Sequence, residues 1–413
     1  MSGSTPEVVG PYLVYEQIGK GGMATVHRAE TQGVEGFRRP IALKRLLTHL
    51  AADPDFVKSF VHEARLASHL HHTNVAQTYD LGKFDNTYFI AMEYVPGATL
   101  SQVLRQCKAA AGPIPIPIVI NILTQICDGL DHAHNLADGS GKPLGIIHRD
   151  VSPANVIVSN TGIVKLIDFG IAKAHSSGGQ TQTGMIKGKF GYLAPEYTYG
   201  QLDSRCDLFA VGVVAHELLT GRRLFDGEDN FETITMLREA PIHPPSRARR
   251  EVPPDLDDIV MTALQRDPRL RWQSASAMRI ALANSARDAR LEVGNGRVFE
   301  WVEWAFTQQR RSEDSGLARV IEALGEPSSA SVELSIDELD ELTEAPTTAG
   351  RPGAIHAAER ARPEPAFVPS TAPRTTKLQL GSRWLWVLVT VLLVLAAAAA
   401  VLALETYELT LDL

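Results

Sequence analysis

Short apolar segments with strand-like patterns dominate the first hundred residues of the chain. Tyr12–Ile18 alternates apolar and polar residues, and Ile41–Lys44 and Tyr88–Val95 are further β-prone runs. Between the last two runs, Asp53 and Pro54 are suited to begin a helix. One face of that helix would contain Phe56, Phe60, Glu63, Ala67 and Leu70. The pattern predicts a β-sheet accompanied by one helix.

The middle of the chain is helical by the same criterion. Ser101–Ala111 and Pro117–Ala137 are predicted helices, and Leu291–Leu324 also has a helical pattern. One stripe of the second helix contains Ile118, Ile122, Ile126, Leu130 and His134. Because His134 belongs to an apolar stripe, we interpret it as a packed core residue rather than a catalyst.

Two β-prone runs interrupt this helical region and are separated by the turn residues N-T-G. The runs are Val156–Ser159 and Val164–Ile167, and together they predict a β-hairpin. A hairpin returns the chain to its starting point, so we expect Asp168 to lie beside Asp150 and Asn155. Two carboxylates and an amide oxygen then form a site for a hard cation such as Mg2+, with one carboxylate left to handle a proton.

The last ninety residues change character twice. Residues 326–382 are rich in Pro, Ala, Thr, Ser and acidic residues, which predicts a disordered linker. Residues 384–404 contain no charge and would span roughly 30 Å as a helix, which predicts one transmembrane helix. Basic residues precede this run and acidic residues follow it. The positive-inside rule therefore predicts a single-pass protein of the inner (plasma) membrane, with its main domain in the cytoplasm and residues 405–413 outside.

Composition narrows the class of protein. Of the 413 residues, 44% are apolar and 21% are charged, as in ordinary globular proteins. The net charge of -8 gives no reason to expect a nucleic-acid partner. Cys107, Cys127 and Cys206 are scattered without metal-ligand spacing, which fits a reduced, cytosolic setting. Met1–Pro11 is polar, so we expect no secretory signal peptide.

Several motifs in order resemble the protein-kinase family. H-R-D-x-x-x-x-N contains Asp150 and Asn155 and is followed by D-F-G, which begins at Asp168. A glycine-rich G-K-G-G-M-A-T-V begins at Gly19, and A-P-E ends at Glu196. The glycine-rich run is most similar to bacterial, eukaryotic-like (Hanks-type) serine/threonine kinases.

This resemblance implies an α+β, two-lobed protein-kinase fold. The kinase domain would cover residues 12–285, with a small β-rich N-lobe at 12–95 and a larger helical C-lobe at 96–285. Residues 286–325 would form a helical extension before the linker. The family cofactors, ATP and Mg2+, follow from the resemblance as well.

The resemblance also implies a nucleotide site. Lys44 would contact the α- and β-phosphates of ATP and pair with Glu63, while backbone groups at Glu93 and Val95 would hold the adenine. The nucleotide-binding positions are then Ile18, Gly19, Gly21, Gly22, Val26, Ala42, Lys44, Glu63, Glu93, Val95 and Asp168.

Catalytic roles follow from the same motifs. Asp150 would accept or orient the proton of the substrate hydroxyl, assisted by Lys44 and Asn155, and Asn155 and Asp168 would bind Mg2+. Arg149 would offer a cation to a phosphate on the loop before A-P-E, where Thr181 and Thr183 are the favoured phosphosites.

Other matched positions are architectural. Glu196 would pair with a buried Arg271, and Asp207 would anchor the backbone of the catalytic loop from below. His148 would be a packed, structural residue.

Two departures leave an alternative open. Ser152 replaces a lysine that is common in serine/threonine kinases, and Lys189 follows Gly188 where threonine is frequent. The sequence predicts a membrane-anchored kinase that phosphorylates serine or threonine hydroxyls of protein substrates, with a homodimer as a possible arrangement for trans-autophosphorylation. The alternative is a pseudokinase scaffold that binds nucleotide and partners without transfer.

Overall fold

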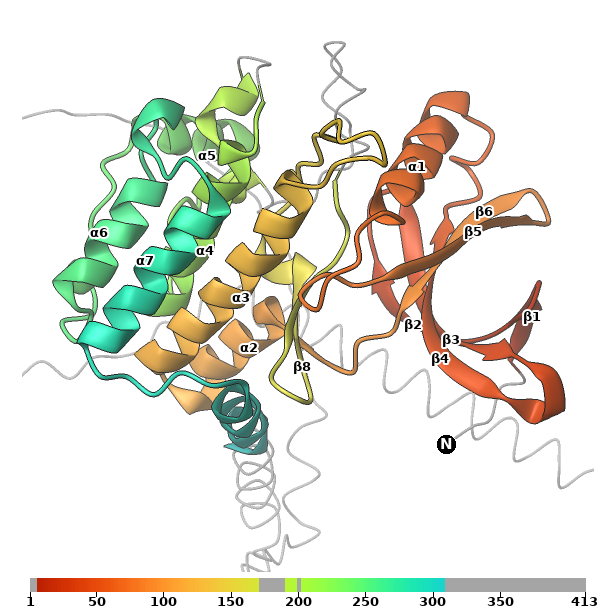
Figure 1. The fold of residues 1–413 in the computed structure, drawn as a ribbon, viewed down its shortest axis with the longest axis horizontal. Helices are drawn as coiled ribbons and strands as arrows, with labels where there is room; N and C mark the ends of the chain where they lie inside the picture. The colour runs from red at the N-terminus through yellow and green to blue at the C-terminus, as the bar shows by residue number, and fades with distance from the viewer. Residues whose placement is uncertain (1–5, 171–189, 199–201, 309–413) are drawn as a thin grey trace, which may run out of the picture. The chain divides into compact units, whose positions relative to one another are not determined.

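The computed structural model describes residues 6–170, 190–198 and 202–308. The N-terminal part is an antiparallel six-stranded sheet in the order β1-β2-β3-β4-β6-β5 (Figure 1). Its strands are β1 (Glu7–Val9), β2 (Tyr12–Lys20), β3 (Ala24–Gln32), β4 (Arg38–Leu46), β5 (Thr78–Phe84) and β6 (Thr87–Glu93). Every strand pairs with a neighbour in an antiparallel register, so this sheet forms the predicted β-rich lobe.

One helix, α1 (Pro54–Ala67), packs against the sheet (Figure 1). Asp53 caps it, because the side chain accepts a hydrogen bond from the Asp55 amide at 2.9 Å. Phe60 and Ala64 join a buried cluster with sheet residues. The helix ends at Ala67, so Leu70, which was expected on the helix, lies beyond it and is nevertheless fully buried.

The C-terminal part is helical. Its long helices are α2 (Leu100–Gln106), α3 (Ile116–His134), α4 (Arg205–Thr220), α5 (Asn230–Glu239), α6 (Pro254–Ala263) and α7 (Ala275–Asp288). A π-helix, η2 (Cys107–Ala111), extends α2. Residues 295–308 are also helical. Short 3-10 helices are η1 (Val34–Gly36), η3 (Pro153–Asn155), η5 (Phe190–Tyr192), η6 (Pro195–Thr198), η7 (Pro245–Arg247) and η8 (Pro268–Leu270).

The centre of this lobe is α4. Its residues are buried continuously from Cys206 to Leu219, because the sequence is apolar around most of the helix circumference. α3 packs against α4, and its predicted stripe is buried from Ile118 to Leu130. Together they support the loops on which the candidate site lies.

A second, three-stranded sheet contains the hairpin that leads to the candidate site. β8 (Val156–Ser159) and β9 (Val164–Leu166) form the predicted hairpin, and β7 (Gly97–Thr99) pairs with β8. The sequence did not predict β7 or β5. A Cβ atom on Gly97 would lie 2.1 Å from the Val158 carbonyl oxygen, so only glycine permits this approach.

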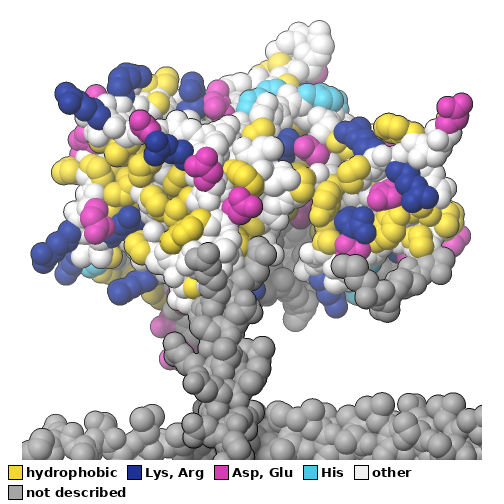
Figure 2. All heavy atoms as spheres, turned by 90° about the horizontal axis from the view of Figure 1, so that it is seen from below, with side chains coloured by type: hydrophobic (Ala, Val, Ile, Leu, Met, Phe, Trp, Pro, Cys, Tyr) yellow, Lys and Arg dark blue, Asp and Glu magenta, His cyan; other side chains and the backbone are white. Residues whose placement is uncertain are grey.

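The surface of the described residues is mixed in charge. On the face shown in Figure 2, Lys and Arg side chains are interspersed with Asp and Glu. The predicted linker, transmembrane helix and outer tail, residues 326–413, lie outside the described residues. Within the part of the chain that the structure describes, no helix combines the length and apolar character needed to cross a bilayer.

Candidate active site

A buried lysine joins the sheet to α1 and to the D-F-G segment. Lys44 lies on β4 opposite Val26 of β3. Its Nζ donates to Glu63 Oε1 at 2.7 Å and to Asp168 Oδ1 at 2.8 Å. Only 7% of Lys44 and 6% of Glu63 is exposed. Burial alone would lower the pKa of Lys44, but the carboxylates of Asp168 and Glu63 outweigh it and raise that pKa, so the lysine is a fixed cation.

The catalytic-loop aspartate and asparagine are in direct contact. Asn155 Nδ2 donates to the carboxylate Oδ2 and to the backbone carbonyl of Asp150, both at 2.8 Å. The amide of Ile167 donates to the Asn155 carbonyl at 3.0 Å, which ties this loop to the far end of the hairpin. Because Nδ2 is engaged, the side-chain oxygen of Asn155 is the atom that can bind a cation.

The D-F-G segment is held against the H-R-D segment. Asp168 and Arg149 have positive φ angles of 55° and 63°, which L-residues keep only where the surroundings fix them. The Gly170 amide donates to the His148 carbonyl at 2.7 Å, and the Phe169 ring lies 4.4 Å from the His148 ring. These contacts hold the D-F-G segment against the H-R-D segment, which is the proximity that the hairpin argument predicts for the two segments.

Asp207 anchors the catalytic loop from α4. Its carboxylate accepts hydrogen bonds from the amides of His148 and Arg149 and from His134 Nε2, all at 2.8 Å. Burial acts to raise the pKa of Asp207, but the hydrogen bonds, with His134 first, hold it below its ordinary value. The expected anchor is present. His134 does more than fill the core, because it supplies one of these bonds.

Predicted nucleotide-binding residues on β2, β3 and β4 lie opposite one another in the sheet. Gly19 pairs with Val26 across β2 and β3, and Ala42 precedes Lys44 on β4. The amide of Gly21 donates to the Ala24 carbonyl at 2.8 Å and closes the glycine-rich turn. The turn therefore lies one strand away from the lysine cation.

The other predicted nucleotide-binding positions are Ile18, Gly22, Glu93 and Val95. Ile18 is 47% exposed on β2, and Gly22 follows in the glycine-rich turn. Glu93 ends β6, and Val95, which is buried, follows it. The Glu93 carboxylate accepts from Lys165 Nζ at 2.9 Å, a contact with β9 that the sequence did not reveal. The roles of these residues in binding nucleotide stay predictions.

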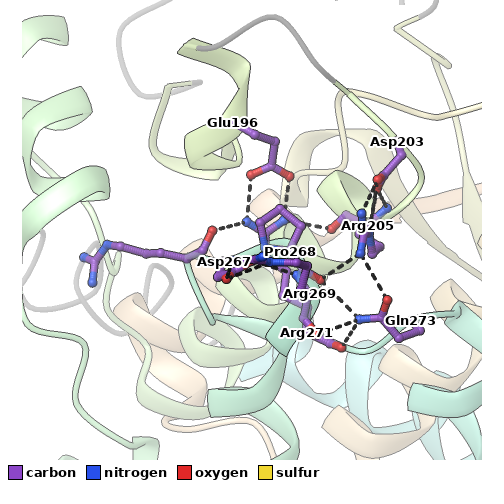
Figure 3. Close-up of polar contacts among 9 residues, drawn as sticks. Glu196, Asp203, Arg205, Asp267, Pro268, Arg269, Arg271 and Gln273 are labelled. Carbon is purple, nitrogen blue, oxygen red and sulfur yellow. Dashed lines mark hydrogen bonds and ion pairs between the residues drawn. The ribbon is translucent and has the colours of Figure 1, made fainter.

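A buried ion pair supports the site from the A-P-E segment (Figure 3). Arg271 Nη1 and Nη2 donate to the two carboxylate oxygens of Glu196 at 2.6 and 2.7 Å. The Arg271 side chain is fully buried and also lies 4.9 Å over the Phe209 ring of α4. The contact expected from the motifs is present and ties the segment to the helical core.

Comparison with known proteins identifies the family. The model of the protein kinase domain matches residues 12–282. The chain belongs to the protein kinase family. Its relatives place it more narrowly among bacterial, eukaryotic-like serine/threonine kinases.

Three curated kinases illustrate the similarity. Tyrosine-protein kinase MasK of Myxococcus xanthus is 39% identical over 274 residues, 66% of this chain and 42% of MasK. Serine/threonine-protein kinase PrkC of Bacillus subtilis is 37% identical over 272 residues, 66% of this chain and 40% of PrkC. Serine/threonine-protein kinase PknL of Mycobacterium tuberculosis is 35% identical over 281 residues, 68% of this chain and 67% of PknL. The chain thus spans about two fifths of MasK and PrkC.

A solved structure supports the fold of the kinase domain. The Mycobacterium tuberculosis PknI kinase domain superposes with a TM-score of 0.52 and 28% identity, covering 69% of this chain and all of that one. The two-lobed kinase fold predicted from the motifs is therefore confirmed.

The donor atoms of the kinase site fit the family's ATP and divalent metal. Asp168 and Asn155 offer a carboxylate and an amide oxygen, the ligands that Mg2+ prefers, and Lys44 offers a cation to phosphate beside them. When bound, the metal would neutralise negative charge on the phosphates. The comparisons give no support to the pseudokinase alternative.

Proposed function

We propose that the protein transfers the γ-phosphoryl group of ATP to serine or threonine hydroxyls of protein substrates. The observation that carries this proposal is the placement of the Lys44 ammonium between Glu63 and Asp168, next to the contact of Asn155 with Asp150. These groups bind phosphate, hold metal and orient a hydroxyl, which are the tasks that phosphoryl transfer requires of a protein.

The tasks of this reaction are divided among four residues. Lys44 binds and orients the α- and β-phosphates, while Asn155 and Asp168 would hold the metal. Asp150 orients the acceptor hydroxyl and takes its proton, and Asn155 fixes that carboxylate through Nδ2. His148 is a packed residue, because it is fully buried; that burial lowers its pKa and favours the neutral ring.

The test is radiolabel transfer by the full-length chain in detergent or vesicles. The unsubstituted chain with Mg-ATP should label itself or a generic acceptor protein. Asp150→Asn should remove the label while the dissociation constant for ATP stays within about twofold, because Asp150 acts on the acceptor rather than on the nucleotide. Persistent labelling in Asp150→Asn would refute the assignment of Asp150.

Acceptor specificity needs its own measurement, because MasK is named a tyrosine kinase whereas PrkC and PknL are named serine/threonine kinases. Phosphoamino-acid analysis of the labelled products should show phosphoserine or phosphothreonine. Phosphotyrosine as the main product would overturn the serine/threonine part of the proposal and leave the kinase part intact.

Phosphate on the activation loop is a further part of the proposal. Nε and Nη1 of Arg149 are buried and have no hydrogen-bond partner among the described residues. A phosphate group supplies acceptors for such a guanidinium. The favoured phosphosites Thr181 and Thr183, and Lys189, lie outside the described residues. Mass spectrometry of the native protein should find phosphate at Thr181 or Thr183.

Membrane anchoring and trans-autophosphorylation complete the proposal. The charge-free run at 384–404 supports an anchor in the inner membrane with the kinase domain in the cytoplasm. Fractionation should find the full chain in membranes and a chain ending at residue 383 in the soluble fraction. An active chain should also label an Asp150→Asn chain added to it; failure to do so would contradict transfer between two copies.

A further inference from the structure

The segment 291–308 lies beyond the family match, which ends at residue 282, yet it packs on the kinase core. Val298 and Ala305 are fully buried and Val302 is 8% exposed. Val298 and Val302 belong to the same buried cluster as α3 and the catalytic hairpin β8–β9. The helix that they occupy is the last one coloured in Figure 1. This segment is therefore part of the folded unit.

Asn295, at the start of that helix, contacts two buried amides of α3. Its Oδ1 accepts from Gln125 Nε2 at 3.2 Å and from Asn121 Nδ2 at 3.3 Å. Gln125 and Asn121 are 8% and 7% exposed, whereas Asn295 is exposed on its remaining surface. The side-chain amides of Asn121 and Gln125 thus face the extension rather than water.

The same glutamine bonds the catalytic hairpin. Gln125 Oε1 accepts from the Val164 amide at 2.9 Å, and Nε2 donates to the Gly162 carbonyl at 3.2 Å. Asn74, in the segment after α1, donates to Gln125 Oε1 at 2.9 Å and to the Val164 carbonyl at 2.8 Å. One buried cluster of amides therefore joins the extension to the turn and second strand of the hairpin.

Gly162 shows how closely the extension approaches that turn. Its φ is +76°, and a Cβ atom placed on it would lie 1.8 Å from the carbonyl oxygen of Asn295. No side chain fits between the two backbones. The backbone of the hairpin turn is therefore in direct contact with the backbone of the extension.

The hairpin carries the chemistry at its two ends. Asn155 immediately precedes β8, and Asp168 lies two residues after the end of β9. The Ile167 amide and the Asn155 carbonyl are hydrogen-bonded, so a displacement of the hairpin is transmitted to both metal-binding oxygens. Transfer rates fall steeply when such groups are misplaced.

We propose that the extension 291–308 is a positioning element for the catalytic hairpin, with Asn295 as its positioning residue. The proposal rests on the proposed function. The segment that leads to the predicted linker and anchor thereby raises the rate of phosphoryl transfer by holding Asn155 and Asp168 in place.

The first test uses Asn295→Ala and Asn295→Asp in the full-length chain. Asn295→Ala removes the acceptor of both bonds, from Gln125 and from Asn121, and should lower kcat about two- to tenfold with the KM for ATP unchanged. Asn295→Asp keeps an acceptor oxygen and should restore the rate. Hydrogen exchange at the hairpin turn, residues 160–163, should be faster in the alanine variant only. Equal rates in all three proteins would overturn the proposal.

The second test separates the clash at Gly162 from backbone strain. Gly162→Ala should lower kcat more than Gly141→Ala, because Gly141 has a similar φ of +82° but open space around it. Equal kcat values for the two variants would overturn the inference alone. A fall in kcat that merely follows a fall in melting temperature would also count against it. An unsubstituted chain that transfers no label would instead overturn the proposed function.

Discussion

Loss of the Glu196 carboxylate should destabilise the kinase domain through the buried Arg271. All five donors of that guanidinium have acceptors: two carboxylate oxygens of Glu196, and the carbonyls of Gln265, Arg205 and Arg266 at 2.5, 3.1 and 2.9 Å. Figure 3 shows Arg271 with Glu196 and Arg205. Glu196→Gln is nearly isosteric, but it removes the negative charge and turns an NH2 group toward one guanidinium nitrogen.

The magnitude follows from burial. The Arg271 side chain is 0% and the Glu196 side chain 11% exposed, so water cannot replace the lost partner. Breaking a buried ion pair costs about 3–5 kcal/mol, and the retained amide oxygen places this substitution near the lower end, at about 3 kcal/mol. With an m-value of about 3 kcal/mol/M, the urea midpoint should fall by about 1 M.

Urea unfolding of the full-length chain, followed by tryptophan fluorescence, measures this shift. The matched control is Asp267→Asn, which breaks the neighbouring pair of Asp267 with Arg269, whose side chains are 33% and 84% exposed. The control should leave the midpoint unchanged within error, because exposed pairs are screened by solvent. Equal midpoints for Glu196→Gln and the control would refute the reasoning from burial.

Three further substitutions test other parts of the structure. Glu63→Gln removes a charge-assisted bond to Lys44 and should lower kcat/KM on the order of 10- to 100-fold in a labelling assay. Ser152→Ala should change neither urea midpoint nor transfer rate by more than about twofold, because its buried Oγ has no hydrogen-bond partner among the described residues. Burial lowers the pKa of His216, so the unfolded chain binds more protons below its ordinary pKa of about 6.5. The neutral His216 ring therefore contributes fully to stability above pH about 6.5, and this contribution is lost as the pH falls below that value. His216→Gln should flatten the slope of unfolding free energy between pH 7 and 5 by up to about 1.4 kcal/mol per pH unit.

Each of these has a contradicting result. Full activity in Glu63→Gln would mean that Asp168 alone holds Lys44. A tenfold loss in Ser152→Ala would show that the hydroxyl contacts phosphate or substrate. An unchanged slope in His216→Gln would mean that the ring titrates alike in the folded and unfolded chains.

Local features of the chain were predictable because they depend on residues close together in the sequence. Asp53 caps α1 through the amide two residues on, and the N-T-G turn returns Asp168 to Asn155 within one hairpin. The pairing of Lys44 with Glu63 followed from the motifs rather than from periodicity, since the two residues lie on different elements.

Other features were decided by the tertiary structure alone. The bond of His134 to Asp207 joins residues 73 positions apart, and an apolar stripe gives no sign of it. The β7 strand was not predicted, because its glycine, Gly97, is required by the close approach of the Val158 backbone. That approach depends on a distant part of the chain and not on the sequence around Gly97. The close approach of the Asn295 backbone to Gly162 likewise joins residues far apart in the sequence. The sequence determined which chemical groups this protein carries, while packing between distant segments determined how they are held, because contacts between distant segments leave no periodic pattern in the chain.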